Sequence, residues 1–140
     1  MDIVFKNFEL SNISEALEEL SSQNLSSIKT SYRLSKMMKA MVPHLRDFAE
    51  ARQKLILSYA KKDDNGELMR PEKDGEVDKD SIVLDNPEEY NKKMIDLLNE
   101  EITVSFSVKL LSLDDLDASG AKISPQKLLI LEKLIEQEEE

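Results

Sequence analysis

The chain has 140 residues and a formal net charge of −10, with no cysteine and a single histidine, His44. A chain of this length can bury a core without a disulfide or metal staple, and without cysteine it has no means of thiol catalysis, CxxC redox chemistry or cysteine-based zinc binding. No apolar run reaches the length of a membrane span and the N-terminus has no secretory pattern. We therefore expect a soluble, acidic, intracellular protein with one domain over residues 1–140.

The N-terminal segment predicts a β-strand followed by a short helix. Residues 2–9 are rich in β-branched and aromatic side chains, with Ile3 and Phe5 on one face of the strand. Apolar residues then recur at helical spacing for about ten residues. Ser11 or Asn12 is the expected N-cap of this helix.

Residues 28–60 carry the strongest helical signal in the chain. Apolar side chains recur at alternating steps of four and three from Leu34 to Tyr59, with Arg52 as the single polar interruption. Pro43 has no N–H to donate to the preceding turn, so we predict two helices here, or one helix with a kink above about 20°. The apolar seam either packs inside the domain, which we favour, or binds a partner helix.

A polar, turn-rich insert at about 61–86 is expected next. The pairs Asn65-Gly66 and Asp74-Gly75 are strong turn signals, so the insert either folds into a hairpin or is mobile. Asn86 is then the expected N-cap of a helix that has proline at its first position and acids in its first turn. This helix should end near Asn99.

The last third of the chain predicts a strand and a final helix. Apolar and polar residues alternate strictly over 102–111, which is typical of a half-buried strand that pairs with residues 2–9. Ser124-Pro125 begins the last helix, and an acidic tail follows at 136–140. These elements predict an α+β fold, mainly α-helical, with a small antiparallel sheet joining the N-terminal strand to a late strand.

Several of these segments resemble a known group of proteins. They are residues 48–66 (FAEARQKLILSYAKKDDNG), residues 86–99 (NPEEYNKKMIDLLN), the late strand and the Ile123–Pro125 turn. In order of elements, residues 1–137 are similar to small acidic proteins of tailed bacteriophages and prophages, a family mostly of unknown function. The methionine-rich stretch 37–41 and the insert 71–80 depart from it. The resemblance implies a phage origin and supplies no catalytic residues.

Charge is unevenly distributed along the chain. Residues 26–62 hold nine Lys or Arg and two acids, a balance of +7, whereas the remainder holds ten Lys or Arg and 27 acids, a balance of −17. Arg33, Lys36 and Lys39 form a candidate basic surface that could bind phosphates. We favour the alternative that these side chains meet acidic neighbours in their own fold, because the net charge repels nucleic acid at long range.

The predicted last helix is apolar on more than one side. A domain of this size normally covers one face of a terminal helix and leaves the other wet. Leu129, Ile130 and Leu134 lie on the excess apolar surface, so we assign them as a candidate contact with a protein partner or a second copy.

No motif indicates catalysis, a metal site or a cofactor. The acidic groups at 63–64 and 74–80 lack the ligand spacing of a calcium-binding EF-hand loop. His44 is not accompanied by a GxSxG sequence, and neither a Walker motif nor GxGxxG is present. We therefore expect no catalytic residues, no metal and no cofactor.

These observations predict a non-enzymatic phage or prophage protein that acts through protein–protein contacts. A virion component or morphogenesis factor is the favoured role, located in the cytoplasm of the bacterial host or incorporated in the virion. The alternative is an acidic inhibitor of a host protein that imitates nucleic acid. The expected partner is a phage or host protein or a second copy; binding to nucleic acid or to a membrane is not expected.

Overall fold

The computed structural model describes residues 1–78 and 81–137, and the chain divides into two compact units. The first unit comprises residues 1–47 and 100–140, and the second comprises residues 48–99. The fold is α+β and mainly helical, as predicted. The single domain stays a prediction, and residues 138–140 of the acidic tail lie outside the described residues.

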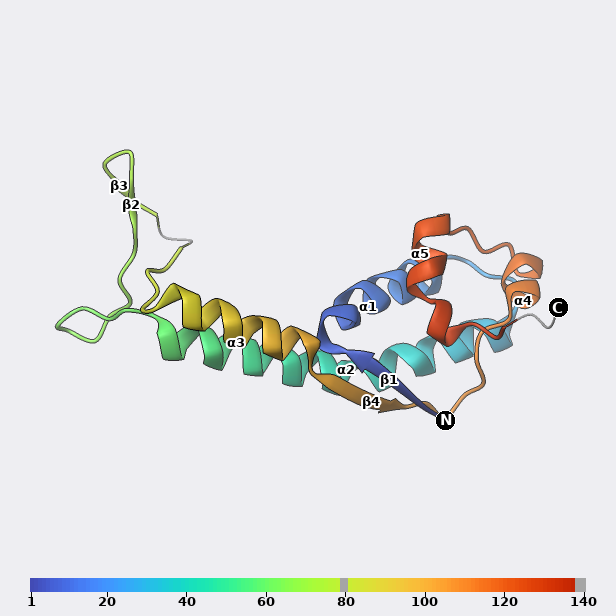
Figure 1. The fold of residues 1–140 in the computed structure, drawn as a ribbon. Helices are drawn as coiled ribbons and strands as arrows, with labels where there is room; N and C mark the ends of the chain where they lie inside the picture. Colours follow the sequence, from blue (N-terminus) through green and yellow to red (C-terminus); the bar gives the residue numbers. More distant parts are fainter. Residues whose placement is uncertain (79–80, 138–140) are drawn as a thin grey trace. The chain divides into compact units, whose positions relative to one another are not determined.

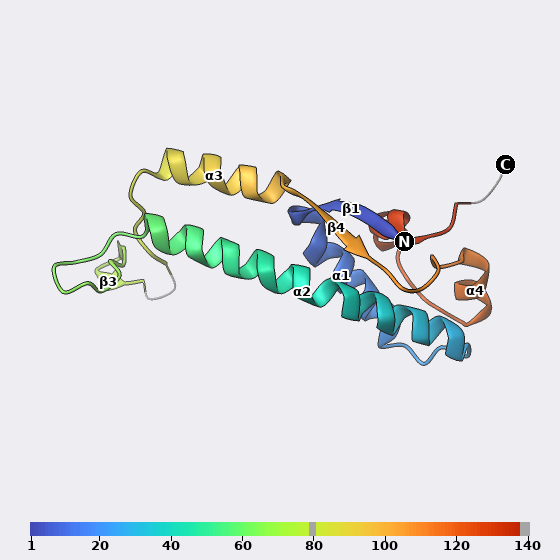
Figure 2. The same ribbon diagram turned by 90° about the horizontal axis from the view of Figure 1, so that it is seen from below.

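β1 (Asp2–Lys6) and β4 (Glu101–Ser105) form the antiparallel sheet of the first unit (Figures 1 and 2). This pairing confirms that the N-terminal strand joins a late strand. Both strands are shorter than predicted. Residues 7–9 are helical, and β4 ends at Ser105, shortly before the chain bends at residues 107 and 108. Backbone hydrogen bonding continues one residue further: the N–H of Phe106 donates to the Met1 carbonyl at 2.8 Å, and the Met1 amine donates to the Phe106 carbonyl at 2.9 Å.

α1 (Asn7–Ser21) begins directly where β1 ends. The Glu9 carboxylate accepts the N–H of Lys6 at 3.4 Å, so an acidic side chain already satisfies the helix start. The predicted N-cap at Ser11 or Asn12 is therefore wrong. The inner face of α1 is buried through four large side chains: Leu10, Ile13, Leu17 and Leu20.

α2 (Ile28–Tyr59) is one continuous helix, so the predicted division into two helices is wrong. Pro43 and Lys39 are both exposed, so water can reach the Lys39 carbonyl that loses its helical partner. A bend at Pro43 stays a prediction. Of the predicted seam, Leu34 and Met41 are fully buried and Met38 is half-buried, so its first part packs inside the first unit. Met37, which is outside the seam, is also fully buried.

The C-terminal part of the first unit contains α4 (Leu113–Ala118), α5 (Pro125–Ile130) and the 3-10 helix η1 (Glu132–Leu134). The single last helix that the sequence predicts is therefore divided in two. The carbonyl of Leu134 accepts the N–H of Leu111 at 2.8 Å, and the carbonyl of Leu111 accepts the N–H of Glu136 at 2.7 Å. These two hydrogen bonds form a parallel β-bridge between Leu111 and Ile135, and the C-terminal helical segment ends there.

The core of the first unit lies between the sheet, α1, α2 and the C-terminal segments. Phe5 and Phe106 meet edge to face, with ring centroids 6.5 Å apart. The predicted inward positions 104 and 106 are buried, whereas residues 103 and 105 are exposed. The largest fully buried side chains are Phe5, Leu10, Leu17, Leu20, Leu34, Met37, Met41, Val104, Leu111, Leu131 and Leu134.

The second unit contains the end of α2, the hairpin of β2 (Glu72–Lys73) and β3 (Glu76–Val77), and α3 (Pro87–Asn99). Asp74 and Gly75 have φ of 55° and 82°, which confirms the turn that this pair predicts. The bounds of α3 also agree with the prediction. The Asn86 side-chain oxygen accepts the N–H of Glu89 at 3.3 Å and caps this helix.

Three short segments of the insert hold one another through backbone hydrogen bonds. The N–H of Lys61 donates to the Val83 carbonyl at 2.8 Å, and the N–H of Met69 donates to the Lys61 carbonyl at 2.8 Å. The N–H of Val83 donates to the Met69 carbonyl at 3.0 Å. The described part of the insert is therefore folded, in agreement with the hairpin alternative.

Candidate functional site

The α5 surface, which we define as Phe8, Leu113, Leu129 and Ile130, is one of the exposed apolar features of the first unit. Leu129 is 71% exposed. A hollow of about 320 Å³ lies on one side of it, lined partly by Phe8 and Ile130. A second hollow of about 530 Å³ lies on the other side and includes Leu113. Leu129 thus forms a ridge between two hollows, a shape that a complementary protein surface can enclose.

The structure retains part of the predicted partner contact. Leu129 is exposed and Ile130 is half-buried, but Leu134 is fully buried in its own unit and leaves the candidate set. Phe8 and Leu113 were missed by the sequence reasoning. Phe8 falls in a segment that reads as strand, and Leu113 adjoins a polar turn, so neither residue showed a helical apolar face.

Ion pairs hold α5 and η1 against the N-terminal elements. The Lys127 ammonium lies 2.6 Å from Glu19 of α1, and its hydrogen bond with that carboxylate raises the pKa of Lys127. The Lys133 ammonium lies 3.2 Å from Glu9 and donates to the Val4 carbonyl at 3.0 Å. These contacts fix the position of the α5 surface on the unit.

The candidate basic surface lies on the first half of α2. The Arg33 guanidinium pairs with Asp115 at 3.6 Å. The Lys36 ammonium lies 5.5 Å from the centre of the Tyr32 ring. Lys39 is exposed and has no ion pair among the described residues. We expected these basic side chains to pair with acidic neighbours in their own fold. Among the three, Arg33 alone does so within the described residues.

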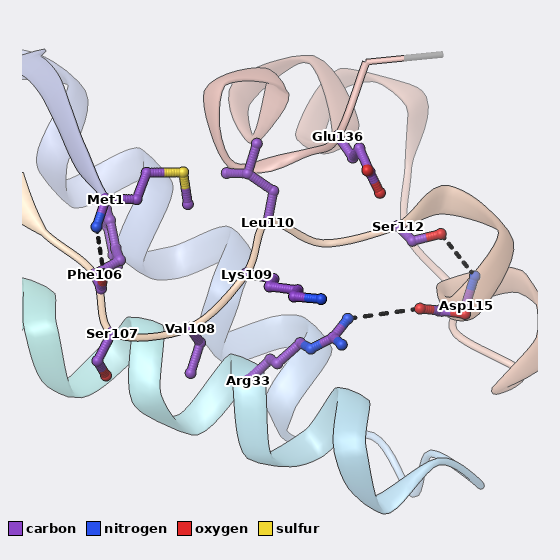
Figure 3. Close-up of a pocket in the computed structure, with 10 residues that line it drawn as sticks. All are labelled: Met1, Arg33, Phe106, Ser107, Val108, Lys109, Leu110, Ser112, Asp115 and Glu136. Atoms are coloured by element: carbon purple, nitrogen blue, oxygen red, sulfur yellow. Dashed lines mark hydrogen bonds and ion pairs between the residues drawn. The ribbon is translucent and has the colours of Figure 1, made fainter. Parts of the chain in front are cut away.

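A hollow of about 740 Å³ lies beside this surface, lined by residues 106–110 and by parts of α2 and α4 (Figure 3). Arg33 and Lys109 extend into it, and Asp115 and Glu136 bring opposite charge to its wall. The Ser112 hydroxyl accepts the N–H of Asp115 at 3.3 Å and caps α4. Arg33, Ser112 and Asp115 are therefore already engaged in contacts within the fold.

The remaining residues singled out by the sequence are structural or isolated. His44 is half-buried on α2, and its side chain makes no hydrogen bond within the described residues. The Asp63 carboxylate accepts the N–H groups of Asn65 and Glu67 at 2.9 and 3.0 Å, which builds the turn there. Across residues 1–78 and 81–137, no three acidic or histidine side chains gather as a metal site. Asp80 of the second acidic group lies outside the described residues.

Tyr59 organises the contact between the two helices of the second unit. Its hydroxyl donates to Glu89 at 2.8 Å, and its ring lies 6.0 Å from the Tyr90 ring. The Lys93 ammonium lies 5.6 Å from the centre of the Tyr59 ring. Interaction with the Tyr59 oxygen, and then with Glu89, raises the pKa of Lys93. This cluster ties α3 to the end of α2.

Comparison of the chain with protein-family models, curated protein sequences and solved structures finds no match. Within the part of the chain that the structure describes, no helix is both long enough and apolar enough to span a bilayer. The surfaces described above are thus the basis for a functional proposal.

Proposed function

We propose that this chain is a non-enzymatic phage or prophage protein that acts through protein–protein contacts, as a virion component or morphogenesis factor, in the host cytoplasm or incorporated in the virion. The observation that carries the contact is Leu129, 71% exposed on a ridge between two hollows. The phage origin is supported by the resemblance of residues 48–66 and 86–99 to small phage proteins.

The size of the α5 surface sets what it can contribute. Complete burial of an exposed leucine side chain is worth about 1.5–3 kcal/mol, so the exposed part of Leu129 supplies about 1–2 kcal/mol. Loss of translational and rotational freedom consumes more than that. Phe8 and Leu113, both partly exposed on the flanks of the ridge, must therefore be covered by the same partner. Salts such as sulfate, which are excluded from the protein surface, strengthen an apolar contact of this kind.

The first test is self-association, measured by sedimentation at about 100 μM for the wild type and Leu129→Glu. We expect the wild type to associate and the variant to sediment as a monomer. Val77→Glu is the matched control, because Val77 is also an exposed apolar residue but lies in the second unit. A monomeric wild type, or equal loss of association in the control, would refute a self-contact through α5.

A second candidate is an acidic inhibitor that imitates nucleic acid and occupies a host protein. It is supported by the charge balance of −17 outside residues 26–62. The two candidates respond differently to salt. Such an inhibitor should lose its partner steeply as salt is raised, whereas an apolar contact should persist.

A further inference from the structure

We propose that a groove at the start of α2 docks an extended, acidic segment of a partner protein. The groove lies in the first unit, between the first turns of α2 and residues 107–109, and has a volume of about 450 Å³. It shares no residue with the α5 surface, so this inference stands independently of the contact proposed there. The residues that the argument uses are Ile28, Lys29, Tyr32, Arg33, Val108 and Lys109.

Apolar side chains line the groove although they face water. Ile28 is 86% exposed and Tyr32 is 58% exposed, one helical turn apart on α2. Val108 is half-buried on the opposite side. In Figure 3 its side chain points toward α2, whereas Leu110 points away from that helix. These three residues supply the apolar contact for alternate side chains of an extended peptide.

The rim of the groove is basic. It is lined by Lys29, Arg33 and Lys109 and by no acidic residue; Arg33 and Lys109 also line the neighbouring hollow, whose wall includes Asp115 and Glu136. Arg33 already forms an ion pair with Asp115, whereas Lys29 and Lys109 form no ion pair within the described residues. This is a local excess of positive charge on a chain whose net charge is −10. Charge complementarity therefore selects an acidic occupant.

The backbone beside the groove offers hydrogen-bonding groups. Residues 101–105 are paired with β1, and the N–H of Leu111 donates to the Leu134 carbonyl at 2.8 Å. Between them, the N–H and C=O groups of residues 107–110 make no hydrogen bond within the described residues. Residues 107 and 108 form a bend, so this segment does not continue the strand geometry of β4. A peptide that lies against the bend can form hydrogen bonds with these groups.

The same features argue against nucleic acid as the occupant. Nucleic-acid binding is governed by the number of phosphates that the protein neutralises, and this rim holds few cations. The charge of −17 outside residues 26–62 repels a long polyanion more strongly than a short acidic peptide. A polynucleotide also offers no peptide backbone to residues 107–110. We therefore commit to an acidic protein segment.

The test is an NMR titration of the 15N-labelled full chain with three defined probes. They are an eight-residue peptide that alternates glutamate with valine, the same peptide with lysine in place of glutamate, and an eight-nucleotide oligothymidine. We expect the acidic peptide alone to shift the amides of residues 107–110. The Leu129→Glu variant should bind it as the wild type does, so failure here is distinguishable from failure of the α5 contact.

The double variant Lys29→Glu, Lys109→Glu should weaken the acidic peptide by about tenfold or more, because each reversal replaces attraction with repulsion. The control is Lys92→Glu, Lys122→Glu, which changes net charge equally at exposed positions outside the groove. All four lysines are surface residues, and thermal unfolding verifies that the variants fold. Equal weakening in the control, equal binding of the lysine peptide, tighter binding of oligothymidine, or unshifted 107–110 amides would each overturn the proposal.

Discussion

Truncation of Phe106 to alanine tests the core of the first unit most directly. The Phe106 side chain is 3% exposed, and its ring meets Phe5 edge to face at 6.5 Å with an interplanar angle of 86°. Phenylalanine truncation in a core costs about 3–5 kcal/mol, from lost burial and the cavity left behind. The edge-to-face pair accounts for about 0.5–1.5 kcal/mol of that loss. Since domains of this size are stable by about 5–15 kcal/mol, Phe106→Ala should remove a large share.

Urea unfolding followed by far-ultraviolet circular dichroism measures this loss. The control is Thr103→Ala, at an exposed position of β4, which should change the free energy of unfolding by less than about 0.5 kcal/mol. A loss below about 1 kcal/mol for Phe106→Ala would refute the assignment of Phe106 to the core. It would also remove the anchor that places residues 107–110 beside the groove.

Two further predictions concern α2 and α5. Pro43→Ala should raise the free energy of unfolding by about 2 kcal/mol, because alanine restores a helical hydrogen bond at an exposed site. This figure allows for the greater conformational entropy of the unfolded chain without proline, which offsets part of the gain. Denaturant unfolding that shows no gain would contradict this account of the helix. The raised pKa of Lys127 stabilises the fold at pH values below its ordinary value of 10.5, and that stabilisation is lost as pH rises through the higher folded-state pKa. The stability difference between wild type and Lys127→Met, measured by thermal unfolding from pH 8 to 12, should therefore stay constant up to about pH 10 and shrink above it; a difference that grows with pH would contradict the Lys127–Glu19 pair.

The parts of the fold that the sequence predicted well are those fixed by local chemistry. Asn86 and Pro87 define the start of α3, Asn86 by capping and Pro87 by its backbone geometry. The Asp74-Gly75 pair defines the turn between β2 and β3. The length of β4 was not predictable in this way. The alternation of apolar and polar residues continues in the sequence to residue 110, but β4 ends at Ser105 and the chain bends at residues 107 and 108. A period-two pattern does not reveal such a change of direction.

The candidate site shows the same division between local and long-range causes. Leu129 was predictable because one side of a short helix must face water. Leu134 was not, because the bonds that draw residues 134–136 against Leu111 join segments that are distant in the sequence. The basic groove was missed for the same reason. Ile28 and Val108 each look like an ordinary apolar residue until the fold brings them to one surface.

The two proposed contacts differ in what limits their affinity. The α5 surface depends on apolar burial, so its strength is set by how much of Leu129 and its flanks a partner covers. In the groove an acidic segment must compete with Asp115 for Arg33, which is already paired at 3.6 Å. Lys29 and Lys109 carry no such competitor among the described residues. These two lysines therefore supply the attraction that a partner gains without displacing an existing ion pair, and the selectivity of the groove for acidic segments depends on them more than on the guanidinium.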